Sequence, residues 1–168
     1  LKLLGLIKQE ALMIKINVII NYVNWFNFIK NPNTYIDRKV KKINLKNKNY
    51  KKNNIYCTLL LSGNREIKKL NRKFRKKNKS TDVLSFPFHK KKNLKYELKK
   101  RKEIYLGDII INLNKVKVDE KRNIKSFKFE FDKLWVHGVA HLFGHDHQKE
   151  QDFKKMLKLE TDYLKYIK

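Results

Sequence analysis

The stretch HGVAHLFGHDH, from His137 to His147, holds four of the five histidines in this 168-residue chain. His137 and His141 stand four residues apart, and on a helix this spacing places both imidazoles on one face, one turn apart. Gly144 follows where a helix can end in a left-handed residue, so that His147 can fold back toward the other two. Three neutral imidazoles that meet at one point form a Zn²⁺ site with an open fourth position, which is typical of catalytic rather than structural zinc.

The spacing matches the pattern H-E-x-x-H-x-x-G-x-x-H of metzincin metalloproteases, with Gly138 in place of the glutamate. In those proteases the glutamate is the general base that deprotonates the zinc-bound water. The stretch therefore predicts a metal site and argues against peptide hydrolysis. The alternative is a histidine-rich helix end without a metal, which the match of three histidines and a glycine disfavours.

Length and composition indicate one domain, because 168 residues with 41% apolar side chains suffice for a single core. We expect this domain to span residues 13–168 and residues 1–12, before the first methionine, to be an N-terminal extension. No uninterrupted apolar run is long enough to span a bilayer, and no signal peptide is evident. The single cysteine, Cys57, excludes an internal disulfide and fits a buried strand position in a reducing, cytoplasmic compartment.

The formal net charge of +26 at pH 7 indicates a polyanionic partner, most simply nucleic acid. The alternative is mutational drift, because lysine greatly outnumbers arginine, and Asn, Ile, Tyr and Phe, which share AT-rich codons with lysine, are abundant. We attribute most of the lysine excess to drift. A surface this basic is nevertheless expected to bind RNA non-specifically, whatever its origin.

Apolar periodicity and turn residues predict strands that interleave with helices. Strands are expected at residues 14–20, 55–61, 83–88 and 105–112, the last buried on both faces. Helices are expected at residues 34–45, at 65–74 after an Asn64 cap, at 126–143 with Ser126 as cap, and at 148–166. Residues 46–54 and 89–101 are expected to be polar loops. These elements favour a single α+β domain in which a small mixed sheet packs with helices.

A second polar stretch, LNRKFRKKNKSTDVLSFPF at residues 70–88, places Arg72 and Arg75 at a helix end, before Thr81, Asp82 and a strand. An arginine that projects from a helix end can clamp a phosphate through a forked pair of hydrogen bonds. The same pattern also describes a solvated basic turn, and the stretch by itself favours that interpretation.

Three stretches together resemble the YbeY family of endoribonucleases: LNRKFRKKNKSTDVLSFPF, LGDIIIN at residues 106–112, and HGVAHLFGHDH, in this order. The usual family patterns are close to LNxxYRxxxxPTDVLSFP, LGDIxIC and HGxLHLxGYDH, and the resemblance extends over roughly residues 14–166. It implies a single α+β domain with a metzincin-like zinc helix. It also implies a single-strand-specific, zinc-dependent endoribonuclease that acts in 16S rRNA 3′-end maturation and ribosome quality control.

By this resemblance, His137, His141 and His147 are the ligands of one Zn²⁺ per chain, and His137 is also counted among the catalytic residues. Arg75 matches the family arginine that is implicated in catalysis. We also place Arg75, together with Arg72, among the substrate-binding residues. Thr81, Asp82, Ser85, Pro87, Gly107 and Asp108 match the surrounding signature.

The chain departs from the family patterns at three positions, where Ser80 replaces proline, Asn112 replaces cysteine and His145 replaces tyrosine. His145 stands beside the ligands and could compete with His147 for the metal. Asp146 could orient a histidine from outside the ligand set, although an aspartate beside a helix end is more often a cap.

The expected partners are single-stranded and ribosomal RNA and the small ribosomal subunit, with no DNA specificity and no membrane; the sequence predicts no oligomeric state. The general base stays open between metal hydroxide and the 2′-hydroxyl of the substrate. Two other functions are considered, a non-catalytic RNA-binding ribosome-assembly factor that holds zinc and a zinc metallopeptidase. An open three-histidine site disfavours the first, because structural zinc usually has four protein ligands, and Gly138 disfavours the second.

Overall fold

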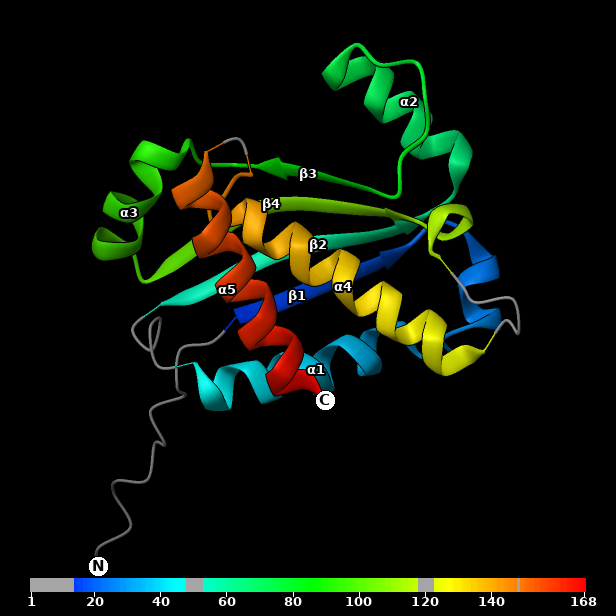
Figure 1. Cartoon of the computed structure of the whole chain (residues 1–168), viewed down its shortest axis with the longest axis horizontal. Helices are drawn as coiled ribbons and strands as arrows, with labels where there is room; N and C mark the ends of the chain where they lie inside the picture. Colours follow the sequence, from blue (N-terminus) through cyan, green and yellow to red (C-terminus); the bar gives the residue numbers. More distant parts are fainter. Residues whose placement is uncertain (1–13, 48–52, 118–122, 148) are drawn as a thin grey trace, which may run out of the picture.

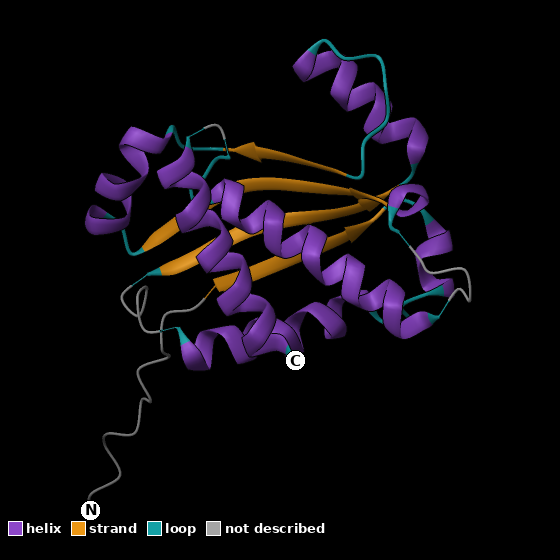
Figure 2. Ribbon diagram, viewed as in Figure 1, coloured by secondary structure: helices purple, strands orange, loops and turns teal. Residues whose placement is uncertain are grey.

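The computed structural model describes residues 14–47, 53–117, 123–147 and 149–168, in which helices surround a four-stranded sheet (Figure 1; Figure 2). The strands are β1 (Ile14–Ile20), β2 (Asn54–Ser62), β3 (Val83–Pro87) and β4 (Glu103–Asn112). The helices are α1 (Pro32–Lys46), α2 (Asn64–Arg75), α3 (Lys91–Lys100), α4 (Ile124–Leu142) and α5 (Glu150–Ile167), with short 3₁₀ helices η1 (Val23–Asn27) and η2 (Leu113–Lys115).

The sheet is mixed, with strand order β1-β2-β4-β3. β1, β2 and β4 are parallel, and β3 runs antiparallel to β4 at the edge of the sheet. The register between β2 and β4 shifts after Tyr56, where Gly107 has a φ of 132° and a Cβ would lie 2.1 Å from the Phe86 carbonyl oxygen. Only glycine suits that position, because L side chains rarely adopt such a backbone conformation. The α+β fold with a small mixed sheet is confirmed.

The main core lies between the sheet and helices α1 and α4, and α5 lies outside across both helices (Figure 1). Ile109 and Ile111 of β4 belong to this core, whereas Ile110, on the opposite face, joins a smaller cluster under α2 with Ile67 and Leu84. The predicted burial of β4 on both faces is therefore confirmed. Cys57 is buried as expected, and burial raises the pKa of its thiol to about 12, so the sulfur is inert at neutral pH.

One predicted loop is wrong. Residues 89–101 contain helix α3, because Leu94 and Leu98, four residues apart, pack on the core. Lysines outnumber these two leucines in the segment and hide the short apolar stripe. Asn53 caps the far end of α3, where its side-chain amide donates to the carbonyl oxygens of Leu98 and Arg101.

Both predicted helix caps are also wrong. Asn123, one turn before Ser126, accepts a hydrogen bond from the Lys125 backbone N–H at 2.8 Å and starts α4 earlier. Asn64 is the first residue of α2 rather than its cap, and Gly63 occupies the cap position without a side-chain bond. Residues 1–12 and 48–52, the expected extension and part of the expected first loop, lie outside the described residues. Within the described ranges, no helix has the length and apolar character needed to cross a membrane.

Helix α4 comes into direct contact with β4 at Gly138. A Cβ at this position would lie 2.6 Å from Cγ2 and 3.0 Å from Cδ1 of Ile109, which is fully buried. Side chains do not pack at such distances without moving. The glycine therefore permits the close approach of α4 to the sheet, and it explains in physical terms why no glutamate occupies this position.

We predict that Gly138→Ala destabilises the protein, because overpacking costs about 1–3 kcal/mol, offset in part by up to about 1 kcal/mol of improved helix propensity. The measurement is urea unfolding in a double-mutant cycle with Ile109→Ala. Removing the Ile109 side chain should shrink or reverse the penalty of Gly138→Ala. An equal penalty in both backgrounds would contradict the close contact.

Candidate metal centre

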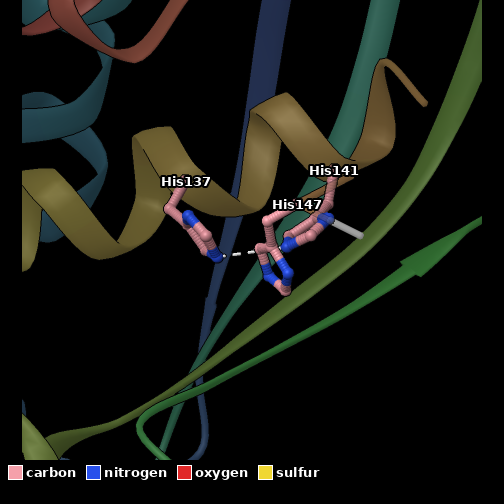
Figure 3. A group of neighbouring side chains, drawn as sticks. All are labelled: His137, His141 and His147. Carbon is pink, nitrogen blue, oxygen red and sulfur yellow. Dashed lines mark hydrogen bonds between the residues drawn. The ribbon is translucent and has the colours of Figure 1, made fainter. Parts of the chain in front are cut away.

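Helix α4 and the turn after it deliver three histidines to one place. His137 and His141 project from the last two turns of α4, and His147 returns from the following segment (Figure 3). The return depends on Gly144, whose φ of 81° lies in the left-handed region, as predicted. The Gly144 N–H donates to the His141 carbonyl oxygen at 2.9 Å, and the His145 N–H donates to that of Ala140 at 3.2 Å. These bonds end the helix and reverse the chain.

The three imidazoles converge. Each of them offers one ring nitrogen, and these three atoms lie within 4.8 Å of one another. The Nε2 atoms of His137 and His141 are 3.1 Å apart. Two ligands at roughly 2.0–2.1 Å from a tetrahedral zinc ion are about 3.3 Å apart, so the spacing fits such an ion. In the part of the chain that the structure describes, no other group of His, Cys, Asp or Glu has this arrangement.

Hydrogen bonds to the other ring nitrogens set the tautomers. His137 Nδ1 lies 2.8 Å from Glu160 Oε1 on α5, and His141 Nδ1 lies 3.0 Å from the His145 carbonyl oxygen. A carboxylate and a carbonyl oxygen accept hydrogen bonds, so each ring carries its proton on Nδ1 and leaves a lone pair on Nε2. Two lone pairs that face each other at 3.1 Å repel, and a cation between them removes that repulsion. The donor set therefore fits a metal ion.

Burial favours the neutral, metal-binding form of the central ligand. Desolvation, followed by the charge of His137, lowers the pKa of His141 below its ordinary value. A neutral imidazole is the form that coordinates a metal, so the surroundings of His141 prepare it for binding at neutral pH.

His145 and Asp146 lie beside the three ligands and have other partners. The His145 ring is directed to α5, with Nδ1 3.9 Å from Asp152 Oδ1, and only its backbone carbonyl faces the site. Asp146 Oδ1 accepts from the backbone N–H of His147 at 2.7 Å and lies 3.6 Å from His147 Nδ1. Asp146 thus shapes the turn that presents His147.

Arg75, the last residue of α2, reaches the edge strand. Its Nη2 donates to the Ser85 carbonyl oxygen at 3.3 Å. Ser85 pairs with Ile109, the residue that underlies Gly138 between the two helical ligands. The guanidinium is therefore anchored on the strand next to the one that α4 crosses. This hydrogen bond uses one of the five N–H groups of the Arg75 guanidinium.

Arg72 stands about one helical turn before Arg75 on α2. It lines an open hollow of about 620 Å³ together with other basic residues of that helix, Arg65, Lys68, Lys69 and Lys73, and with Asn78. Its side chain is exposed, and none of the three histidines lines this hollow.

The signature residues around Arg75 organise the turn between α2 and β3. Asp82 Oδ1 accepts from Thr81 Oγ1 at 2.9 Å and from the Val83 N–H at 2.8 Å. Asn112, which replaces the family cysteine, donates from Nδ2 to the Thr81 carbonyl oxygen at 3.0 Å and to Asn64 Oδ1 at 2.8 Å. These bonds tie the end of β4 to both ends of the segment that carries Arg75.

Sequence reasoning missed Glu160. It stands 23 residues after His137, and its position opposite that ring follows from the packing of α5 on α4, which no local pattern shows. His137 and Glu160 also line a crevice of about 490 Å³ between α4, α5 and the start of β3. The crevice is also lined by three lysines, Lys115, Lys117 and Lys133, and by two further acidic residues, Asp82 and Glu130. Lys133 pairs with Glu130, so the charges of the lining are balanced.

The bond from Glu160 to His137 predicts a change in metal affinity. A carboxylate partner fixes the ring and increases its basicity, and loss of such a partner typically weakens metal binding by about 10–100-fold. Glu160→Ala should show this loss in zinc competition against a chromophoric chelator. Glu160→Gln, whose amide oxygen still accepts the bond, should lose less. Glu150→Gln in the first turn of α5, whose carboxylate pairs with Lys154, is the matched control. Equal zinc affinity of wild type and Glu160→Ala would contradict the assignment.

Comparison with known proteins indicates the same family that the three sequence motifs resemble. A family model described as Endoribonuclease YbeY matches residues 23–168. A relative of that name from Pelagibacter ubique is 46% identical over 156 residues, covering 93% of this chain and 97% of that protein. Another, from Thermodesulfovibrio yellowstonii, is 36% identical over 133 residues, covering 79% of this chain and 77% of that protein.

The solution structure of a Thermotoga maritima protein has a TM-score of 0.52 at 21% identity. It covers 91% of this chain and 89% of that one, and supports the fold alone. The match to the family model spans most of the sequence, and the three histidines with their glycine converge as the family pattern requires. On these grounds, the chain belongs to the YbeY family of endoribonucleases.

Proposed function

We propose that this protein is a zinc-dependent endoribonuclease that cleaves single-stranded RNA. The observation that carries the proposal is the open group of three imidazoles, each of which offers one ring nitrogen within 4.8 Å of the other two. Structural zinc normally has four protein ligands, whereas three protein ligands leave a position for chemistry. The relatives that are 46% and 36% identical to this chain are named endoribonucleases, which supports RNA as the substrate.

His137, His141 and His147 would hold the ion, and when bound it supplies Lewis-acid chemistry at the phosphoryl group. Arg75 would stabilise the negative charge that develops on the phosphoryl oxygens, because its bond to Ser85 fixes the guanidinium on the edge strand. Gly138 offers no carboxylate, and Glu160 is bonded to His137, so the described site lacks the free glutamate base of a metallopeptidase. The crevice beside His137 would receive the chain that flanks the cleaved bond, with Lys115 and Lys117 as its phosphate contacts.

The cellular role that we propose is 16S rRNA 3′-end maturation and ribosome quality control, with ribosomal RNA and the small ribosomal subunit as partners in the cytoplasm. The family membership and the positive charge of the chain support this role. The buried, inert thiol of the single cysteine is compatible with a reducing compartment.

The test is incubation of the purified protein with ribosomal RNA, with and without a chelator. We expect cleavage only when the metal is present, and none by His137→Ala. Binding without cleavage in the metal-loaded wild type would instead identify a non-catalytic assembly factor. Metal-dependent digestion of casein would identify a peptidase.

We predict that Arg75→Ala retains zinc and fold but loses about a hundredfold to a thousandfold in kcat, corresponding to roughly 2.7–4 kcal/mol, by analogy with loss of one oxyanion donor. Arg75→Lys should rescue poorly, because an ammonium cannot make the forked contact. Arg72→Ala, which removes a guanidinium that lines the hollow on α2, is the comparison variant and should leave kcat at saturating RNA nearly unchanged. Cleavage by Arg75→Ala at the wild-type rate, or a defect that disappears at saturating RNA, would refute a catalytic role.

A further inference from the structure

Helix α2 projects from one end of the sheet (Figure 1). Only a few of its residues are buried against the rest of the protein. Its buried residues are Ile67 and Asn71, and Leu70 packs partly against the small cluster beneath it. The rest of the helix surface faces solvent. An element with so little apolar contact presents most of its side chains to a partner.

The exposed surface of α2 carries unbalanced positive charge. Residues 64–79 contain nine lysines and arginines and one acidic residue, Glu66. Helix α5, by contrast, contains four basic and four acidic residues within a similar length. Helices α1 and α3 each contain five basic residues and one acidic residue, so positive charge alone does not distinguish α2. What distinguishes α2 is the arrangement of its cations on one side of the helix.

Five of these cations lie on one side of the helix and line a common hollow: Arg65, Lys68, Lys69, Arg72 and Lys73. Their spacing of three and four residues places them side by side along about 12 Å of helix. None of them forms an ion pair with a described residue. A row of unpaired like charges repels itself, and an elongated polyanion relieves that repulsion.

An exposed aromatic ring adjoins this row, because Lys73 Nζ lies 5.2 Å from the centroid of the Phe74 ring. The Phe74 side chain is 58% exposed, and its ring contacts Phe86 of β3 edge to face, with centroids 5.2 Å apart. The next residue is Arg75, which is anchored on Ser85, the neighbour of Phe86. The ring therefore lies between the basic row and Arg75 along the chain.

We propose that α2 is an RNA-docking arm. Its basic row holds the phosphate backbone of a single strand, and Phe74 stacks on an unpaired base of the segment that continues toward Arg75. Cationic grooves with interspersed aromatic rings bind single strands in this way, since every base has a face to stack. The inference rests on the proposed function, because it assigns Arg75 to the same RNA strand.

The charge of the arm is tested with Lys69→Ala/Lys73→Ala against the matched control Lys41→Ala/Lys46→Ala, two exposed lysines of α1. Binding of the zinc-loaded protein to a labelled single-stranded oligodeoxynucleotide, which keeps phosphates and bases but is no ribonuclease substrate, is followed by anisotropy over a range of salt. Each phosphate contact contributes about 0.7 to the slope of log affinity against log salt. The slope of the α2 variant should be smaller in magnitude than that of the wild type by about 1.4, and the slope of the control should equal that of the wild type.

Equal salt slopes for the two double variants would contradict the proposed docking arm. The positive charge of the whole surface, rather than that of α2, would then account for the binding. The assay needs no cleavage, so the two hypotheses fail separately. If the wild type binds with the expected slopes but does not cleave RNA, the docking arm stands and the proposed nuclease activity does not.

The aromatic contact is tested with Phe74→Ala and with Phe74→Leu, which keeps an apolar contact to Phe86 but lacks a flat ring. Phe153→Ala on α5, whose side chain is 46% exposed, is the matched control. Both Phe74 variants should bind the single strand about fivefold or more weakly without a change in salt slope, and duplex binding should not change. Wild-type affinity of both Phe74 variants would remove the stacking role. Unchanged nucleic-acid binding by all α2 variants, with loss of binding to polyglutamate, would identify an acidic protein as the partner and overturn the proposal.

Discussion

Two imidazole nitrogens, Nε2 of His137 and Nε2 of His141, face each other 3.1 Å apart with their protons on the far side of each ring. This arrangement is unfavourable without a cation, and the surrounding structure maintains it. Gly138 lets α4 lie directly on β4, so that the helix and its histidines are fixed against the sheet. Gly144 reverses the chain and returns His147, and α5 provides the carboxylate of Glu160. The fold therefore prepares the metal site before a metal binds.

The glycine at position 138 links packing to chemistry. In the metzincin pattern a glutamate at the corresponding position serves as general base. Here the close approach to Ile109 leaves no space for a Cβ. In the proposed mechanism, Arg75, held on the neighbouring edge strand, would meet the charge that develops on a phosphoryl group. The packing that fixes α4 on the sheet therefore leaves position 138 without the general base of the metzincin pattern.

Local patterns predicted most of the fold and the convergence of the histidines. The strand at residues 14–20 and the left-handed Gly144 agree with the structure because period-two alternation and helix-end glycines are local signals. Helix α3 was missed because its apolar stripe is only two leucines among many lysines. Glu160 and the carbonyl of His145 could not be predicted, since their roles depend on how α5 and the chain reversal pack against α4. Asn123 and Ser126 both have side chains that can cap a helix, and Asn123, the earlier of the two, is the N-cap of α4.

The most direct test of the central claim, that His137, His141 and His147 hold one zinc ion while His145 contributes only its backbone, is the zinc content of purified single variants by mass spectrometry. The account predicts one zinc per chain in the wild type and in His145→Ala, because that ring is turned to Asp152. It predicts loss of zinc in His147→Ala. Retention of zinc by His147→Ala together with its loss from His145→Ala would contradict the account, since the third ligand would then be the other histidine.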